Sequence, residues 1–536
     1  MALMALVSCN KAAKMAELAD LVKVECNPEI LEVIGDNIDA DVTVTFPEKY
    51  FHKKAILEIT PVMKFDGQEL PGEPFIYQGE KVTDNYKTVG YDGASITEHV
   101  SFPYIKGMEK SELVGRAVVR YKSKSWAFPE DIKIADGAIT TCKLASNTGY
   151  YAPVADSYQE VIPEEVEAQI LYLINSANVR SNQLSSESIK EYKTGVKDVM
   201  NDSRRTITGT DIIAYASPDG PEKRNNILSG EREKSAKNAF KQVSKQLETG
   251  NVETQSIGED WEGFQELVNN SNIEDKDLIL RVLSMYSDPD VREREIKNMS
   301  SVYGTLAKDV LPELRRARFI TNVEFQNYTP EELLALVEDN INVLDEEALL
   351  RSATLTKDDA AKLDIYRHAI NKYDSDRAKL NSACIYLDQN KEEKAEAILK
   401  KVTDKSIAGL NNLRGVLAMR DGDLRKAAEF FEKESDVAGK INLGTIDLMN
   451  GNYTAAAKKL AGTGNENEAL AYILNGDLNK AANLLKDNDS DVAAYERAII
   501  AARQGKAAVA KAELAKIKSA ELKKKAENDV EFAKVL

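Results

Sequence analysis

Histidine and cysteine, which many catalytic and metal centres use, are rare in this sequence, whereas its many carboxylates are expected on solvent-exposed faces. The 536 residues include three histidines, four cysteines and two tryptophans. His52, His99 and His368 lie in unrelated stretches, so no histidine cluster is expected. No cysteine pair has metal-ligand spacing, and neither a glycine–lysine phosphate loop nor a His-Glu-x-x-His motif occurs. The sequence therefore predicts no metal and no cofactor, and it favours a protein that is not an enzyme.

The chain also lacks long apolar runs and an excess of positive charge. No stretch of 18 or more apolar residues occurs, so no membrane-spanning helix is expected. The net charge is −17, and the acidic residues are spread along the chain. This balance argues against a nucleic-acid partner and against attachment to anionic lipid through basic residues. The length favours three or four domains.

The N-terminal residues MALMALVSC form a short apolar run that ends Leu-Val-Ser-Cys. This ending resembles a bacterial lipobox, the cleavage site after which a cysteine carries lipid. The resemblance implies lipidation of Cys9, with residues 1–19 as a signal remnant and tether and the natural start of the chain upstream. A cysteine of no special role is the alternative. Because basic residues follow Cys9, we expect the protein on the periplasmic side of the outer membrane.

Residues 20–160 show the alternation of β-strands. Val42, Val44 and Phe46 alternate with threonines, and Gly and Pro separate this run from the others. Several short strands with turns between them predict an antiparallel, sandwich-like domain. Cys26 and Cys142 lie near its two ends, so a disulfide is one expectation and two buried free thiols the other.

Residues 206–240 read as a strand, a tight turn and a helix. The turn is Ser-Pro-Asp-Gly-Pro at 217–221, which neither a strand nor a helix continues through. The following helix carries a stripe of apolar residues, and Arg232 lies on that stripe. An arginine there needs a carboxylate or carbonyl partner, from the protein or from a ligand.

This segment resembles the OmpA-like domain, a βα fold whose members often bind peptidoglycan in the periplasm. The matching residues are Gly220, Asn225, Leu228, Ser229 and Arg232. The resemblance implies an OmpA-like domain over residues 161–327. It also implies the peptidoglycan-binding candidates Asn225, Arg232, Ser217 and Asp219.

The chain departs from the family at Ser217. The family's aspartate, which holds the amine of the diaminopimelate unit, falls at this position. A neutral serine forms no such ion pair, which leaves Asp219 as the substitute to be tested.

A helical insertion is expected at residues 261–316, before a last strand from Ala317 to Phe325. This arrangement resembles OmpA-like proteins of the Bacteroidetes group. Asp260 is interpreted as a helix N-cap with Trp261 as a core anchor. A catalytic Glu259 and Asp260 pair is the sharper alternative, but no other residue type converges on it.

Residues 328–536 are predicted to be helical repeats that follow a capping box at Thr329–Glu332. A Gly or Asn in a turn is followed five residues later by Ala and nine residues later by a large apolar residue. This occurs five times, with turn residues Asn390, Gly422, Gly451, Gly476 and Gly505. The pattern is similar to the tetratricopeptide repeat, which implies stacked helical hairpins and a groove for a protein partner.

These features together predict a multidomain α+β protein. The expected function is a periplasmic adaptor lipoprotein, which holds a protein assembly or secretion complex together through the groove of its helical repeats. The alternative is a structural tether that binds peptidoglycan through the OmpA-like domain.

Overall fold

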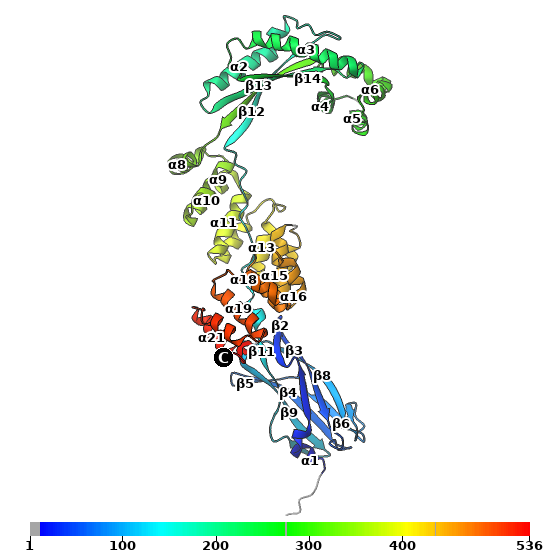
Figure 1. Ribbon diagram of the computed structural model, residues 1–536, viewed down its shortest axis with the longest axis vertical. Coiled ribbons are helices and arrows are strands. Elements are labelled where there is room, and N and C mark those ends of the chain that lie inside the picture. The colour runs from blue at the N-terminus through cyan, green and yellow to red at the C-terminus, as the bar shows by residue number, and fades with distance from the viewer. Residues whose placement is uncertain (1–10, 274–275, 435) are drawn as a thin grey trace, which may run out of the picture. The chain divides into compact units, whose positions relative to one another are not determined.

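The structure is a computed structural model that describes residues 11–273, 276–434 and 436–536 (Figure 1). The chain forms two compact units. Unit 1 comprises residues up to Val154 together with residues 370–536, and unit 2 comprises Ala155–Ala369. Among the described helices, none has the length and apolar character needed to cross a membrane. The predicted lipidation site, Cys9, lies outside the described residues.

The N-terminal part of unit 1 is one sheet of eleven strands in the order β1-β3-β2-β11-β9-β4-β6-β7, with β10, β5 and β8 as side pairs. A short helix, α1 (Ala13–Glu17), precedes it. The strand bounds are β1 Lys23–Asn27, β2 Ile30–Ile34, β3 Asn37–Phe46, β4 Ile56–Phe65, β5 Gln68–Pro71, β6 Phe75–Gly79, β7 Lys87–Val89, β8 Ala94–Pro103, β9 Ser111–Tyr121, β10 Lys124–Ala127 and β11 Ile132–Ile139.

The sheet encloses an apolar core, because its long strands alternate buried and exposed residues. On β3, Val42, Val44 and Phe46 are buried, as the sequence pattern predicted. The sheet differs from a sandwich of two separate layers because β2 pairs antiparallel with β3 and parallel with β11. That strand joins both halves into a continuous, half-barrel-like sheet. Cys26 and Cys142 are free thiols here, so the disulfide alternative is not the observed state.

Unit 2 opens with a four-stranded sheet in the order β12-β15-β13-β14. Its strands are β12 Val161–Leu171, β13 Arg205–Ala216, β14 Asn251–Glu259 and β15 Arg316–Gln326, and its helices are α2 Glu187–Asn201 and α3 Glu222–Val243. Only β13 and β14 pair in parallel. Both helices bury apolar side chains against one face of the sheet, with Tyr192 and Phe240 in the shared core (Figure 1).

The helical insertion of unit 2 has a small core of its own. It comprises α4 Trp261–Asn269, α5 Lys276–Met285, α6 Pro289–Asn298 and α7 Ser300–Asp309. Asp260 caps α4 by accepting a hydrogen bond from the backbone N–H of Gly263, as predicted. Its carboxylate also pairs with Arg316 at 2.8 Å, so the buried charge has an internal partner.

Three helices follow the sheet of unit 2, and the last of them leads into the repeats. They are α8 Pro330–Asn340, α9 Glu346–Leu355 and α10 Asp359–Tyr373. The predicted capping box is present at the start of α8. The Thr329 side chain accepts from the Glu332 N–H, and the Glu332 side chain accepts from the Thr329 N–H.

The C-terminal part of unit 1 is an array of five helical hairpins in the described part of the chain. Each hairpin pairs a first and a second helix: α11 Asp376–Asp388 and α12 Glu392–Leu399, α13 Leu410–Arg420 and α14 Leu424–Phe431, α15 Val437–Met449 and α16 Tyr453–Leu460, α17 Asn467–Leu474 and α18 Leu478–Leu485, α19 Asp491–Arg503 and α20 Ala507–Leu514. A last helix, α21 (Ala520–Asn528), is followed by a 3-10 turn at Val530–Phe532. The array confirms the predicted helical repeats.

The turn residue of each hairpin adopts a left-handed backbone, for which Gly and Asn are best suited. The recurring alanine of the second helix is buried where the two helices meet. Small residues on the first helix let the helices approach closely. At Gly415, for example, an added Cβ would lie 2.4 Å from the Phe431 ring.

The two ends of unit 1 meet, because the N-terminal sheet packs against the end of the helical array. Lys525 Nζ donates to Thr140 Oγ1 at 3.0 Å, and Thr141 Oγ1 donates to Glu531 at 2.8 Å. Arg503 on α19 pairs with the same Glu531 carboxylate. The apolar end of the last hairpin is therefore covered by α21, the 3-10 turn and the sheet.

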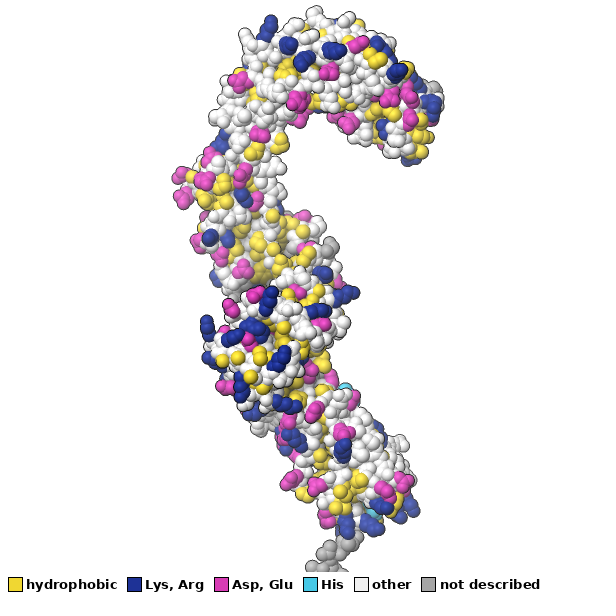
Figure 2. Space-filling view, in the orientation of Figure 1, with side chains coloured by type: hydrophobic (Ala, Val, Ile, Leu, Met, Phe, Trp, Pro, Cys, Tyr) yellow, Lys and Arg dark blue, Asp and Glu magenta, His cyan; other side chains and the backbone are white. Residues whose placement is uncertain are grey.

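Charged side chains of both signs cover the surface in view, and basic ones gather over the C-terminal helices (Figure 2). Exposed lysines of this region include Lys506, Lys511, Lys516 and Lys518. The net charge of −17 is thus unevenly distributed.

Candidate functional site

Arg232, a candidate from the sequence, is fully buried in unit 2. Its guanidinium donates to three backbone carbonyls: Ser176 O at 3.0 Å, Tyr215 O at 2.8 Å and Leu173 O at 3.3 Å. The guanidinium also lies over the Tyr172 ring, 5.0 Å from its centroid. Burial lowers the pKa of Arg232 to about 10, so the side chain stays charged at neutral pH. Of the carboxylate or carbonyl partners expected for this arginine, the structure shows carbonyls, and they come from the protein itself.

Ser217 and Asp219 lie beside this arginine and form a polar group with Arg315. The Ser217 hydroxyl donates to Asp219 Oδ1 at 2.7 Å, and Arg315 Nη2 donates to Asp219 Oδ2 at 2.8 Å. Both charged side chains are 14% exposed. The carboxylate that would hold a ligand amine is thus already neutralised by Arg315.

Asn225 is buried at the start of α3 and joins the turn to the end of β14. Its Nδ2 donates to Ser217 O, Gly220 O and Glu259 Oε1. Glu259 also accepts from Trp261 Nε1 at 2.8 Å, and burial raises the pKa of this carboxyl. The structure therefore brings all four candidates to one end of the sheet, where they bond to one another and to the backbone.

A second site, in unit 1, was not predicted. Residues 145–154, here called the strap, leave the N-terminal sheet and lie along the first helices of the repeats. Four buried asparagines on those helices contact the strap, and they are here called the asparagine strip: Asn381 on α11, Asn412 on α13, Asn442 on α15 and Asn467 on α17.

Three asparagines of the strip each bind both main-chain groups of one strap residue. Asn467 accepts from the Ser146 N–H and donates to the Ser146 carbonyl, both at 2.8 Å. Asn442 does the same for Tyr150 at 2.7 and 2.8 Å. Asn381 binds Val154 at 2.7 and 3.0 Å. The contacts fall on every fourth strap residue, so the strap is held as an extended chain.

Asn412 completes the asparagine strip by linking two hairpins. It donates to the Tyr150 carbonyl at 2.9 Å and accepts from Asn442 Nδ2 at 2.8 Å. The strap therefore runs against the order of the repeats, from α17 towards α11.

Side-chain contacts add selectivity at the middle of the strap. The Tyr151 hydroxyl donates to Asp388 at 2.6 Å, and its ring lies 5.8 Å from the Arg420 guanidinium. Arg420 Nε donates to the Thr148 carbonyl at 2.9 Å. Gly149 has a left-handed φ of +79°, and an added Cβ would lie 2.7 Å from Val416 Cγ2. This position therefore selects glycine on two grounds.

One sequence signal could have found the asparagine strip. Asparagine is a poor helix former and is uncommon at buried helix positions. Yet Asn381, Asn442 and Asn467 each stand two residues before the small residue of their helix, at Ala383, Gly444 and Ala469. A polar residue that recurs at one buried position indicates a common ligand, here an extended main chain.

The fifth hairpin carries Glu496 at this position, two residues before Ala498. Glu496 is 3% exposed, and burial raises its pKa to about 8, partly offset by Arg497. Between its ordinary pKa and about 8, the folded protein binds a proton that the unfolded chain lacks. This side chain therefore makes the folded state less stable as the pH rises through that window.

We expect Glu496→Gln to raise the free energy of unfolding of unit 1 above that of the wild type, and this gain should be about 1–3 kcal/mol larger at pH 8 than at pH 5. The glutamine is uncharged at both pH values, so the variant lacks the destabilisation that a buried glutamate causes as the pH rises. Urea unfolding of both proteins at the two pH values measures the difference. An identical pH dependence for wild type and variant would show that Glu496 stays ionised in the folded protein.

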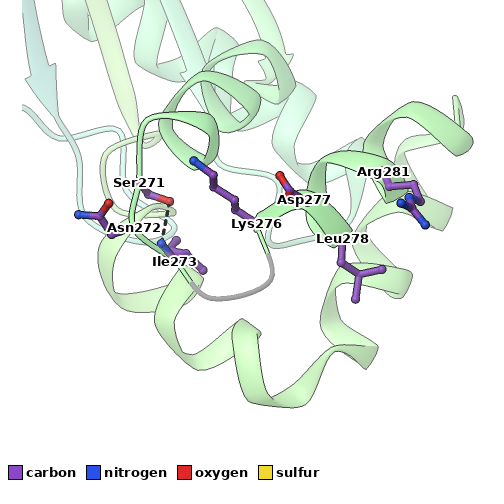
Figure 3. A pocket seen from close by; sticks show the side chains of 7 residues that line it. All are labelled: Ser271, Asn272, Ile273, Lys276, Asp277, Leu278 and Arg281. Atoms are coloured by element: carbon purple, nitrogen blue, oxygen red, sulfur yellow. Dashed lines mark hydrogen bonds between the residues drawn. The ribbon is translucent and has the colours of Figure 1, made fainter.

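A surface depression of about 520 Å³ lies between α4 and α5 (Figure 3). Its lining side chains are Ser271, Asn272, Ile273, Lys276, Asp277, Leu278 and Arg281. Ser271 and Asn272 lie on the opposite side from Arg281, so these polar groups do not converge. Within the described ranges, no group of three or more His, Cys, Asp or Glu side chains is placed to hold a metal ion.

Neither a protein-family model nor a curated protein matches the chain. Among solved structures, a tetratricopeptide repeat protein from Parabacteroides merdae is similar with 16% identity and a TM-score of 0.29, over 37% of this chain and 90% of that one. The APC/C hetero-tetramer Cut9–Hcn1 is similar with 14% identity and a TM-score of 0.31, over 66% of this chain and 75% of that one. At these TM-scores the similarity is too low to define the repeats, whose architecture is seen in the five hairpins of this chain.

Proposed function

We propose that the protein is an interaction scaffold that binds a protein partner through its helical repeats. The asparagine strip carries this proposal, because its carboxamides bind both main-chain groups of an extended polypeptide. Four of the five stacked hairpins hold these carboxamides at a regular spacing, as a peptide-binding surface requires.

The finer proposal is an adaptor lipoprotein of an assembly or secretion complex in the bacterial periplasm. The lipobox-like sequence supports an outer-membrane anchor at Cys9, and the basic residues after it support the periplasmic side. Extraction with a mild detergent, followed by identification of co-purifying proteins, tests the scaffold. We expect a partner to co-purify in a fixed ratio, whereas a chain recovered alone at native levels would count against the proposal.

The second candidate is a tether that binds peptidoglycan. It is supported by the match of Gly220, Asn225, Leu228, Ser229 and Arg232 to the OmpA-like signature and by the placing of Asp219 near Arg232. The burial of Arg232 and the ion pair of Asp219 with Arg315 favour the scaffold instead. A ligand amine would have to displace Arg315 before it reached the carboxylate.

Co-sedimentation with purified diaminopimelate-type peptidoglycan separates the two candidates. If the tether is correct, the wild-type protein pellets, and Asp219→Asn weakens binding at least tenfold because the charge for the ligand amine is lost. Asp198→Asn, an exposed site on α2, is the matched control and should bind as wild type does. Wild-type protein that stays in the supernatant would eliminate the tether and leave the scaffold.

A further inference from the structure

The strap occupies the surface that a partner of the repeats would use. Its main-chain groups at Ser146, Tyr150 and Val154 already satisfy the carboxamides of Asn467, Asn442 and Asn381. A partner's extended segment therefore finds no free carboxamide at these three positions while the strap is in place.

The strap is held mainly by contacts that another chain could reproduce. A carboxamide that pairs with the N–H and carbonyl of one residue reads the main chain and is indifferent to the side chain. Much of the strap also faces solvent, with Asn147, Thr148, Ala152 and Pro153 exposed. Replacing the strap with a similar chain would thus uncover little apolar surface beyond that covered by Ala145, Tyr151 and Val154.

We propose that residues 145–154 are an intramolecular ligand that closes the asparagine strip, and that a partner's extended segment binds by taking the strap's place. This inference rests on the proposed scaffold function and adds its regulation. The partner segment should carry a glycine followed two residues later by an aromatic residue, as Gly149 and Tyr151 do.

The competition follows from tethering. A segment attached at both ends has a high effective concentration at its own site, in the millimolar range for short flexible links. An external segment of equal intrinsic affinity therefore binds weakly until the strap is released. Any event that weakens strap docking raises the apparent affinity for the partner.

The test uses a fluorescent peptide with the sequence of residues 143–156, added to the full chain and followed by anisotropy. Gly149→Ala places a Cβ 2.7 Å from Val416 Cγ2, so the variant strap docks poorly while every asparagine is retained. We expect peptide binding at least tenfold tighter than to wild type. Tyr151→Ala, which removes the contacts to Asp388 and Arg420, is a second strap variant and should act in the same direction.

Two controls locate the binding. Gly422→Ala carries the same left-handed strain, with a φ of +86°, but its Cβ meets nothing within 4 Å, so it should bind peptide as wild type does. Adding Asn442→Ala to the Gly149→Ala variant should weaken peptide binding at least tenfold relative to Gly149→Ala alone. Equal binding by wild type and both strap variants, or a gain that survives Asn442→Ala, would overturn the exchange.

The outcome is independent of the partner's identity, because the probe is the chain's own sequence. If the peptide exchanges with the strap but no protein co-purifies, the scaffold function is contradicted and the strap exchange stands. A chain that co-purifies with a partner but shows no exchange would contradict the inference alone.

Discussion

Replacing Phe431 with alanine is expected to lower the free energy of unfolding of the helical array by about 3–5 kcal/mol. Phe431 is the large apolar residue of the second hairpin and is 0% exposed. Its ring packs over Gly415 of the preceding helix, where an added Cβ would lie 2.4 Å from Cε1 of the ring. The substitution removes apolar burial and leaves a cavity between α13 and α14.

Denaturant unfolding followed by helical circular dichroism measures this effect. Phe430→Ala is the matched control, because the neighbouring ring is only partly buried and should cost about 1 kcal/mol. Since each hairpin is stabilised by its neighbours, the loss should appear in the unfolding of the whole array. Equal effects at the two positions would mean that the hairpins are not packed as described.

Replacing Arg232 with methionine is expected to destabilise unit 2 by about 2–4 kcal/mol. Methionine has a similar length but no donor, so the carbonyls of Ser176, Tyr215 and Leu173 lose their partner. Removing the buried charge also removes its desolvation cost. The expected loss in the free energy of unfolding is therefore smaller than the sum for three hydrogen bonds to a charged group. The segment after β12 is then no longer tied to β13 and α3.

Hydrogen exchange at the β13 amides, read together with denaturant unfolding, measures the effect in unit 2 itself. Arg224→Met on the same helix is the control, because Arg224 is exposed and should shift stability by less than about 0.5 kcal/mol. An unchanged exchange rate in Arg232→Met would indicate that water replaces the guanidinium. The same comparison is needed before Arg232 variants are used in a peptidoglycan assay, because lost binding could report lost folding.

The repeats could be predicted from the sequence because their determinants are local. A left-handed turn residue, an alanine five residues later and a large apolar residue nine residues later are fixed by the geometry of one hairpin. The N-cap at Asp260 and the capping box at Thr329 follow from local rules in the same way.

The start of β12 was harder to predict because its first residues are polar. Because residues 156–165 are mostly polar, the sequence predicts a link there and a strand only from Val166, whereas the observed strand begins at Val161, five residues earlier. Glu164 forms an ion pair with Arg205 on β13, across the intervening strand β15, so this segment of an edge strand tolerates charge. Residues 156–165 therefore read as a polar link, although half of them pair in a sheet.

The recurring asparagines are a local signal, but their pairing with the strap could not be derived from local pattern. Asn442 and Tyr150 are 292 residues apart, and neither shows its partner in its own neighbourhood. The strap has no strand periodicity, because the carboxamides replace a neighbouring strand and fall on every fourth residue. The candidates Ser217, Asp219, Asn225 and Arg232 lie together because they share one turn and one helix, whereas Arg315 comes from the far side of the insertion.

The contact between the N-terminal sheet and the end of the array joins residues 390 positions apart, at Thr141 and Glu531. During synthesis the sheet leaves the ribosome long before the residues that dock on it exist, so its docking face stays uncovered until residues 525–531 have been made. A chain cut after residue 519 would retain the described strands and the five hairpins, yet it would uncover the apolar end of the last hairpin, against which Ala526, Phe532 and Val535 pack. Residues 520–536 thus cover the last hairpin and hold it to the N-terminal sheet at the same time, so we expect their loss to uncover both partners in a single step.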